Sequence, residues 1–336
     1  MTMFQSNFHV ITKTPLRVSL LGGGTDFEYF YKLHTGHVIN TGINKYVYVT
    51  VKKHNKLFNE NYRLNYSTTE SINNLKDIKN DIIRECLKLV PVKPPIYISV
   101  ISDIPGYSGL GSSSSFTVGL LKALLFIKNK KINQRELAEL ACKIEINILR
   151  NPIGKQDQYV ASHGHFASYK FLRNRKVIIN DIKNNKIINN IFLNSLLVWT
   201  GKFREAKSVL KDQKHRYILN KEYLLKMNTL TSEGLNILKK NFNLKLFLEL
   251  VHKSWLLKKK LSNRISSDKL NNFYKNCVKN GAISGKLLGA GGGGFFLIFF
   301  KKKNKKKIIK FLKNYFYFQC LPSKSGSEII YHNKSR

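Results

Sequence analysis

The sequence predicts an α+β protein with two domains, the first rich in strands and the second rich in helices. Runs of β-branched and aromatic residues that are typical of strands lie mostly before Asn190, at Thr12–Leu21, His37–Lys53, Ile96–Ser102 and Gly164–Ile179. A long lysine-rich stretch, Arg204–Lys260, indicates two or three helices. Because the pattern changes near Asn190, we predict one domain over residues 1–190 and another over 191–336.

In the first part, glycine and proline mark the ends of the predicted elements. The strand Thr12–Leu21 runs into the turn Gly22–Asp26, and His37–Lys53 has the alternation of a strand or hairpin. The polar segment Asn55–Asn80 indicates loops, and Ile82–Val90 indicates a short helix. A strand is then predicted at Ile96–Ser102 and a loop at Asp103–Gly111. A buried helix follows at Ser112–Lys128, and a second helix at Gln134–Leu149. Gly154–Tyr159 indicates a polar loop or the start of a helix.

The second part mixes apolar strands with helices. Ile187–Thr200 contains strand-like runs, and Phe295–Phe300 is apolar throughout, as expected of a buried strand. Lys269–Lys279 and Lys305–Phe318 indicate helices, and Glu328–Tyr331 indicates a last strand. The apolar run of Phe295–Phe300 is far shorter than the roughly 20 residues of a membrane span, so no membrane partner is expected.

Charge is the most unusual bulk property of the chain. It has 58 Lys and Arg against 20 Asp and Glu, a net charge of +38, which favours anionic partners such as nucleotides, sugar phosphates, nucleic acids or membranes. The abundance of Lys, Asn, Ile, Phe and Tyr is also what an AT-rich genome would produce. Because the lysines are dispersed rather than confined to one stripe, codon bias is the preferred explanation, and a nucleic-acid partner is not expected.

Cysteine usage and the first residues of the chain bear on where the protein works. The cysteines are widely scattered, at Cys86, Cys142, Cys277 and Cys320. Without a Cys-x-x-Cys pair they form neither a zinc pattern nor a disulfide framework. Met1–Lys13 lacks the basic start and apolar stretch of a secretory signal. We therefore predict a soluble cytoplasmic protein; the sequence carries no signal for an oligomeric state.

The segment Pro105–Ser115 carries the strongest functional signal. Its glycines lack Cβ, so the backbone can approach an anion closely, and a helix then begins at the serines. The first N–H groups of that helix have no intrahelical partners and suit a triphosphate, while serine hydroxyls can reach phosphate oxygens or Mg²⁺. The residues predicted to hold the triphosphate are Pro105, Gly106, Gly109, Leu110, Gly111, Ser112, Ser113 and Ser114.

Two simpler explanations of this segment were weighed. Gly106 and Gly111 have the separation found in a Walker loop, but Ser112 stands where that loop requires lysine, so an ordinary P-loop is excluded. A capped helix after a flexible loop would also contain glycine and serine. Four consecutive serines exceed what a cap requires, which favours phosphate binding.

Two further glycine-rich segments flank this one in the chain. Gly289–Gly294 formally matches G-x-G-x-x-G, but a strand follows it rather than a helix, which argues against a dinucleotide fold. It indicates either a loop packed near the phosphates or substrate, or a plain turn. Gly22–Asp26 is also compatible with a plain turn; its functional interpretation is that the Asp26 carboxylate accepts hydrogen bonds from substrate hydroxyls.

Taken in order, the three glycine segments resemble those of the GHMP kinase superfamily over nearly the whole chain. Pro15–Arg17, Gly22–Asp26 and Gly154–Tyr159 resemble the sugar 1-kinase branch that acts on D-glycero-D-manno-heptose 7-phosphate, close to the fucokinase domain. The resemblance implies a ribosomal protein S5 domain 2-like N-terminal domain and a ferredoxin-like C-terminal domain, with ATP between them. It also implies ATP- and Mg²⁺-dependent phosphorylation of the anomeric hydroxyl of the heptose phosphate, for nucleotide-activated heptose and surface polysaccharide.

The resemblance also assigns roles to individual residues. Asp157 matches the catalytic aspartate, and Arg17 or Lys155 would keep it ionised and stabilise the transferring group. Ser113 matches the Mg²⁺-ligating serine, and Glu145 takes the place of the second Mg²⁺ ligand. The residues predicted to contact the sugar are Gly23, Gly24, Thr25, Asp26, Gly291 and Gly292.

Some positions depart from the family pattern. Leu288 stands where Thr or Ser is frequent, and Tyr107 and Ser115 stand where smaller or apolar residues are common. Glu145 and Asp157 are one residue further apart than their counterparts in mevalonate kinases. The alternatives are another GHMP sugar 1-kinase, acting on fucose or a hexosamine, and a non-catalytic binding protein of the same fold.

Overall fold

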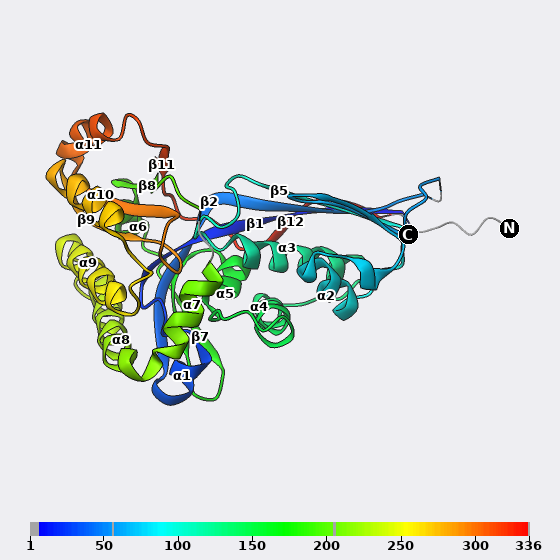
Figure 1. Ribbon diagram of the computed structural model, residues 1–336, viewed down its shortest axis with the longest axis horizontal. Helices are drawn as coiled ribbons and strands as arrows, with labels where there is room; N and C mark the ends of the chain where they lie inside the picture. Colours follow the sequence, from blue (N-terminus) through cyan, green and yellow to red (C-terminus); the bar gives the residue numbers. More distant parts are fainter. Residues whose placement is uncertain (1–6, 56, 204–205, 335–336) are drawn as a thin grey trace.

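The computed structural model describes residues 7–55, 57–203 and 206–334. Its first unit is an eight-stranded sheet whose long central strands extend across the molecule (Figure 1). Hydrogen-bonded neighbours follow the order β12 (Glu328–Lys334), β1 (Phe8–Leu21), β2 (Gly36–Lys53), β5 (Ile96–Ser102), β3 (Tyr62–Asn65) and β4 (Thr69–Ile72), while β6 (Phe166–Phe171) pairs with β2 and with β7 (Val177–Asp181).

Helices cover one side of these long strands (Figure 1). The helix α3 (Ser112–Ile127) packs on β1 and β2, and nearly all of its side chains are buried, as the apolar pattern predicts. Gly119 allows this close approach, because a Cβ there would lie 2.7 Å from the Thr14 hydroxyl. The other helical elements of this unit are α1 (Glu28–His34), η1 (Leu75–Asp77), α2 (Asp81–Leu89), α4 (Gln134–Cys142), η2 (Lys143–Ile148) and α5 (Gln156–His163).

The second unit is a four-stranded antiparallel sheet with helices beside it (Figure 1). Its order is β11 (Tyr317–Gln319), β8 (Ser195–Trp199), β10 (Phe295–Phe300) and β9 (Ala282–Leu287). Every residue of β10 is buried, in agreement with the predicted core strand. The helical elements that follow β7 are α6 (Asn185–Phe192), α7 (Ala206–His215), α8 (Tyr217–Lys239), α9 (Leu244–Lys260), α10 (Asp268–Lys279), η3 (Lys302–Asn304) and α11 (Lys305–Phe311).

The α+β class with two structural units is confirmed. The last strand, β12, pairs with β1, so the end of the chain completes the first sheet rather than the second. The second sheet begins at β8, just after the division predicted between residues 190 and 191, which stays a prediction. None of the helices in the described ranges is long and apolar enough to cross a bilayer.

Several predicted elements differ from the observed ones. Ile187–Thr200 was expected to be strand-like, but its first part belongs to α6, where Asn184 caps the helix and Ile187 and Ile191 face the core at helical spacing. The predicted helix Lys305–Phe318 ends at Phe311, and β11 follows. Three short strands were missed, because β3, β4 and β9 are brief and partly polar.

Other expectations need smaller adjustments. His37–Lys53 is one continuous strand rather than a hairpin. The predicted helical stretch from Arg204 begins outside the described residues, and α7, α8 and α9 supply its three helices from Ala206 onwards. The predicted helix Gln134–Leu149 changes to a π-helix at Lys143, which matters for the site described below.

Candidate active site

The phosphate loop, defined here as residues 105–114, joins β5 to α3. Gly111 is the N-cap of α3 with φ of 78°, a conformation that favours glycine, and no side chain caps this helix end. The first-turn amides therefore keep their donors for an anion. The backbone N–H of Arg17 donates to the carbonyl of Leu110 at 2.9 Å, which attaches the loop to β1.

The serines after Gly111 divide into two pairs. Ser112 is half-buried and Ser113 is exposed, so both can reach a ligand. Ser114 is buried, and the Ser115 hydroxyl donates to the carbonyl of Pro15 at 2.8 Å. Ser115 thus ties α3 to β1, whereas Ser112 and Ser113 keep solvent exposure at the helix start.

The third glycine segment packs directly on the phosphate loop. The N–H of Phe295 donates to the carbonyl of Ser108 at 3.2 Å, and a Cβ on Gly294 would lie 2.3 Å from the same oxygen. Gly291 and Gly292, predicted to contact the sugar, lie against Ile265, whose carbonyl accepts from the N–H of Gly292 at 2.8 Å. The segment is therefore a loop close to the phosphate site, as one of the two interpretations expected.

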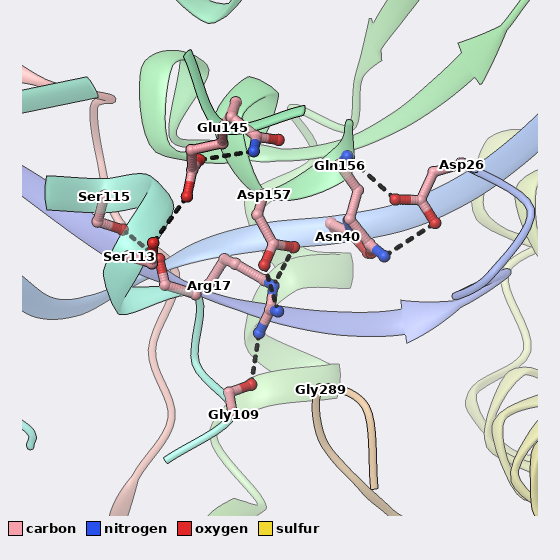
Figure 2. Close-up of polar contacts among 12 residues, drawn as sticks. Arg17, Asp26, Asn40, Gly109, Ser113, Ser115, Glu145, Gln156, Asp157 and Gly289 are labelled. Carbon is pink, nitrogen blue, oxygen red and sulfur yellow. Dashed lines mark hydrogen bonds and ion pairs between the residues drawn. The ribbon is translucent and has the colours of Figure 1, made fainter. Parts of the chain in front are cut away.

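Arg17 and Asp157 form the central ion pair of the site (Figure 2). The guanidinium donates from Nε to Oδ1 at 2.7 Å and from Nη2 to Oδ2 at 2.6 Å. Its third donor, Nη1, reaches the carbonyl of Gly109 at 2.5 Å. One side chain on β1 thus fixes both the carboxylate on α5 and the phosphate loop, in the planar two-donor geometry that arginine favours.

Lys155 occupies a different position from the one its predicted role requires. Its Nζ donates to both carboxylate oxygens of Glu139 at 2.9 Å, and the hydroxyl of Tyr159 also donates to Glu139. Arg17, and not Lys155, contacts Asp157. Lys155 holds the start of α5 against α4, and its catalytic role stays a prediction.

Glu145 lies beside the start of α3, near this ion pair (Figure 2). The Ser113 hydroxyl donates to Oε1 at 2.7 Å, and Gln158 Nε2 donates to Oε2 at 2.7 Å. Burial raises the pKa of the Glu145 carboxyl, while hydrogen bonds from Ser113, Ser114 and Gln158 oppose that rise. A carboxylate and a hydroxyl oxygen at a helix N-terminus fit Mg²⁺, which takes few protein ligands and completes its shell with water and phosphate.

Glu145 is carried by a π-helical segment. The segment η2 follows α4 directly and contains Glu145. A π-turn accommodates one more residue than an α-turn. In this wider turn the Glu145 carboxylate accepts the hydrogen bond from the Ser113 hydroxyl at 2.7 Å.

The loop Gly22–Asp26 is held by its own hydrogen bonds. The Thr25 hydroxyl donates to carbonyls of Gly22 and His37 at 2.9 Å, and Thr25 is fully buried. Asp26 accepts from the N–H of Gly24 at 3.1 Å and from the Gln156 side chain at 3.0 Å. Burial, followed by the charge of Asp157, raises the pKa of the Asp26 carboxyl to about 6.

Two residues of this network were not predicted from the sequence. Gln156 donates its N–H to Asp26 Oδ2 at 3.2 Å, and Asn40 Nδ2 on β2 donates to Gln156 Oε1 at 2.9 Å (Figure 2). A Cβ on Gly154 would lie 2.0 Å from Asp26 Oδ2, so glycine is required for α5 to approach. The neighbourhood of Asp157 could have indicated Gln156, but no local pattern marks Asn40.

Family models match both parts of the chain. The model of the GHMP kinases N terminal domain matches residues 73–165, and that of the GHMP kinases C terminal region matches residues 237–317. The chain is 33% identical over 296 residues to the D-glycero-alpha-D-manno-heptose 7-phosphate kinase of Campylobacter jejuni, covering 83% of this chain and 86% of that one.

Two more distant proteins extend the comparison. The galactokinase of Pyrococcus furiosus is 28% identical over 320 residues, covering 84% of this chain and 86% of that one. The crystal structure of a D-glycero-D-manno-heptose 1-phosphate kinase from Bacteriodes thetaiotaomicron superposes with a TM-score of 0.78 and 24% identity, covering 96% of this chain and 99% of that one. This last likeness concerns the fold.

Proposed function

The chain belongs to the GHMP kinase family and is an ATP-dependent kinase, and from this premise we propose that it phosphorylates the anomeric hydroxyl of D-glycero-D-manno-heptose 7-phosphate. The product would be the 1,7-bisphosphate, a precursor of nucleotide-activated heptose for surface polysaccharide. The likeness to the Campylobacter jejuni kinase supports the acceptor. The observation that carries the chemistry is the Arg17–Asp157 pair, which lies beside the uncapped start of α3.

The residues of the site support a direct transfer. Asp157 accepts the proton of the sugar hydroxyl while the oxygen of that hydroxyl attacks the γ-phosphorus of ATP. A bond from the sugar oxygen to phosphorus forms while the bond from phosphorus to the bridging oxygen breaks, and ADP leaves. Arg17 orients the carboxylate and keeps it ionised before the attack.

The polyphosphate would be bound by the chain's own donors. The amides of Ser112 and Ser113 at the N-terminus of α3 face it, and the helix dipole favours negative charge there. Ser113 and Glu145 would hold Mg²⁺. When bound, the ion neutralises charge on the triphosphate, a task that the lysine of a Walker loop performs in other nucleotide-binding proteins.

A neutral sugar is the competing acceptor. The 28% identity to the Pyrococcus furiosus galactokinase favours it, and fucose or a hexosamine would use the same anomeric chemistry. A sugar 7-phosphate adds two negative charges that must meet cations. The acceptor therefore has to be decided by measuring turnover and not by the transfer chemistry.

The test is an ADP-release assay with purified protein, ATP, Mg²⁺ and a panel of sugars and sugar phosphates. We expect turnover of D-glycero-D-manno-heptose 7-phosphate at the highest kcat/KM of the panel. Turnover of a neutral sugar alone would refute the proposed acceptor, and turnover of none would refute the proposal as a whole.

The role of Asp157 is tested in the same assay. Asp157→Ala should lower turnover about 10²–10⁴-fold because the proton acceptor is lost, while ATP binding by calorimetry persists. Asp81→Ala, which removes an exposed carboxylate on α2, serves as the matched control and should keep the wild-type rate. A fully active Asp157→Ala protein would show that another group accepts the proton.

A further inference from the structure

A lysine buried behind the site joins the two structural units. Lys286 on β9 has an exposed fraction of 1%, and its Nζ donates to the carbonyl of Leu20 at 2.9 Å. Leu20 is near the end of β1, immediately before the Gly22–Asp26 loop. The bond therefore runs from the sheet of the second unit to the strand that carries the predicted sugar loop.

The carbonyl that Lys286 contacts lies at an irregularity of β1. Ser19 pairs with Asn40 and Leu21 pairs with Ile39, so the register of β1 on β2 shifts between them and Leu20 is the extra residue. Such a bulge leaves backbone groups out of the sheet ladder and bends the strand. Lys286 supplies the donor for the bulge carbonyl at the point where the strand turns into the loop.

This arrangement is costly for a lysine. Burial and then the positive charge of Arg17 lower the pKa of Lys286 to about 7. Its hydrogen-bond partner in the described part of the chain is a carbonyl rather than a carboxylate, so no ion pair offsets the burial. An apolar side chain of similar length would remove this burial cost but would leave the buried Leu20 carbonyl without its donor.

Packing contacts also join the Gly22–Asp26 loop to the second unit. Gly24 lies against Leu224 and Leu261, and Gly22 lies against Thr231, which are packing contacts on the helical side of the second unit. On the same strand as Lys286, Leu287 and then Leu288 lead directly into Gly289, the start of the third glycine segment. Lys286 thus sits between the sugar loop and the loop that packs on the phosphate site.

We infer that Lys286 is a positioning residue, whose bond to the Leu20 carbonyl fixes the Gly22–Asp26 loop relative to the Gly289–Gly294 segment. The inference rests on the proposed sugar-binding role of the loop. Lys286 would contact neither the sugar nor the nucleotide. It would act by fixing the position of one binding loop relative to the other. A change at Lys286 should therefore affect the sugar more than ATP.

The test compares two variants of strand β9. Lys286→Met keeps most of the buried length but removes the donor to Leu20. Ser284→Ala is the matched control, because Ser284 lies on the same face of β9, is equally buried, and donates to the carbonyl of Leu248 at 2.7 Å within its own unit. Both variants lose one buried bond to a carbonyl, but only the first loses a bond to the sugar loop.

Two measurements separate the outcomes. In the free protein, Lys286→Met should increase hydrogen exchange of the amides over residues 21–26, with Ser284→Ala unchanged there. In the kinase assay, Lys286→Met should raise KM for the sugar about tenfold, while KM for ATP stays within about twofold. Thermal unfolding should shift by similar amounts in Lys286→Met and Ser284→Ala, because each variant leaves one buried carbonyl without its donor.

Each contrary result has a definite meaning. Unchanged exchange and unchanged sugar KM in Lys286→Met would overturn the inference, and so would equal effects in Ser284→Ala. If Lys286→Met fails to fold, Lys286→Gln, whose donor is one atom short of Lys286 Nζ, should still raise exchange over residues 21–26 above the wild-type level, and no rise would overturn the inference. Hydrogen exchange needs no substrate, so the inference stands or fails separately from the identity of the acceptor.

Discussion

The two sides of the active site use polar groups in opposite ways. On the phosphate side, comprising Ser112, Ser113, Glu145, Asp157 and Arg17, the helix start has no side-chain cap, Ser113 is exposed and the Asp157 side chain is 21% exposed. On the sugar side, comprising Gly22–Asp26, Asn40 and Gln156, the polar side chains of Thr25 and Asp26 are buried and already bonded.

The difference indicates how each ligand would be recognised. A triphosphate would meet the backbone amides at the start of α3, which no side chain caps, so these donors are prepared before binding. The side chains of Arg17 and Ser113 are already bonded to protein groups. A sugar would have to replace the hydrogen bonds that Asp26 makes with Gly24 and Gln156, or form hydrogen bonds with backbone groups around Gly23. Sugar specificity is therefore expected to depend on the geometry of the loop, and hence on residues that hold it.

Among the supports of Asp157, the largest effect is expected on the phosphate side, at Arg17. Arg17→Lys keeps the positive charge but loses the paired hydrogen bonds to the Asp157 carboxylate and the hydrogen bond to the carbonyl of Gly109. We expect kcat to fall about hundredfold, comparable to losing one preorganised donor at an active site. The measurement is steady-state turnover at saturating ATP and sugar.

Arg84 provides a matched control for this substitution. On α2, away from the site, its Nε donates to Glu85, its Nη1 donates to the carbonyl of Ile78 at 2.6 Å, and its Nη2 donates to Asp81. Arg84→Lys thus removes a similar three-way contact and should leave kcat unchanged. Equal losses in both variants would trace the effect to stability instead of to the orientation of Asp157.

The sugar side is tested by the pH dependence of stability. The Asp26 carboxyl has a pKa of about 6 in the folded protein against an ordinary value of 3.8, so the folded state retains its proton at higher pH. Protonated Asp26 therefore adds up to about 3 kcal/mol to the free energy of unfolding. This contribution is complete below about pH 4 and is lost as the pH rises through about 6. Asp26→Asn cannot titrate, and urea unfolding from pH 4 to 7 should show a flatter curve.

A second carboxylate gives a trend of opposite sign. The hydrogen bond from Lys32 lowers the pKa of the half-exposed Glu28, so its contribution is lost as pH falls. Glu28→Gln should remove a small part of the destabilisation at acid pH and leave the trend from Asp26 in place. If Asp26→Asn keeps the wild-type slope, the carboxylate is better solvated than its burial indicates, and the contrast between the two sides weakens.

The phosphate side was predictable because its signal is local. Glycines and serines within 105–115 are contiguous in sequence and have the composition that a loop and a helix start require. The roles of Asp157 and Glu145 were predicted from the family resemblance alone and stay predictions. The π-helix that carries Glu145 beside Ser113 was not predicted, since no sequence pattern marks a widened turn.

The sugar side and its supports depend on long-range contacts. Asn40 on β2 and Lys286 on β9 act on residues far away in the sequence, and each is surrounded in the chain by ordinary strand residues. Lys155 was predicted beside Asp157 from its position alone, whereas Glu139, sixteen residues earlier, draws it to α4. Periodicity predicts which face of an element is buried but not which distant group that face meets.

The smallest effect tests whether the phosphate loop depends on its shape. Gly111→Ala places a Cβ 3.0 Å from Arg17 Cγ at a left-handed φ of 78°, and should raise KM for ATP about tenfold and cost about 1–2 kcal/mol of stability. Gly201→Ala is the matched control, because Gly201 has nearly the same φ, 79°, with nothing within 4 Å of its added Cβ. It should show the loss of stability without the change in KM. If both variants bind ATP like wild type, the uncapped start of α3 tolerates displacement of Arg17, and the phosphate side is less preorganised than its geometry indicates.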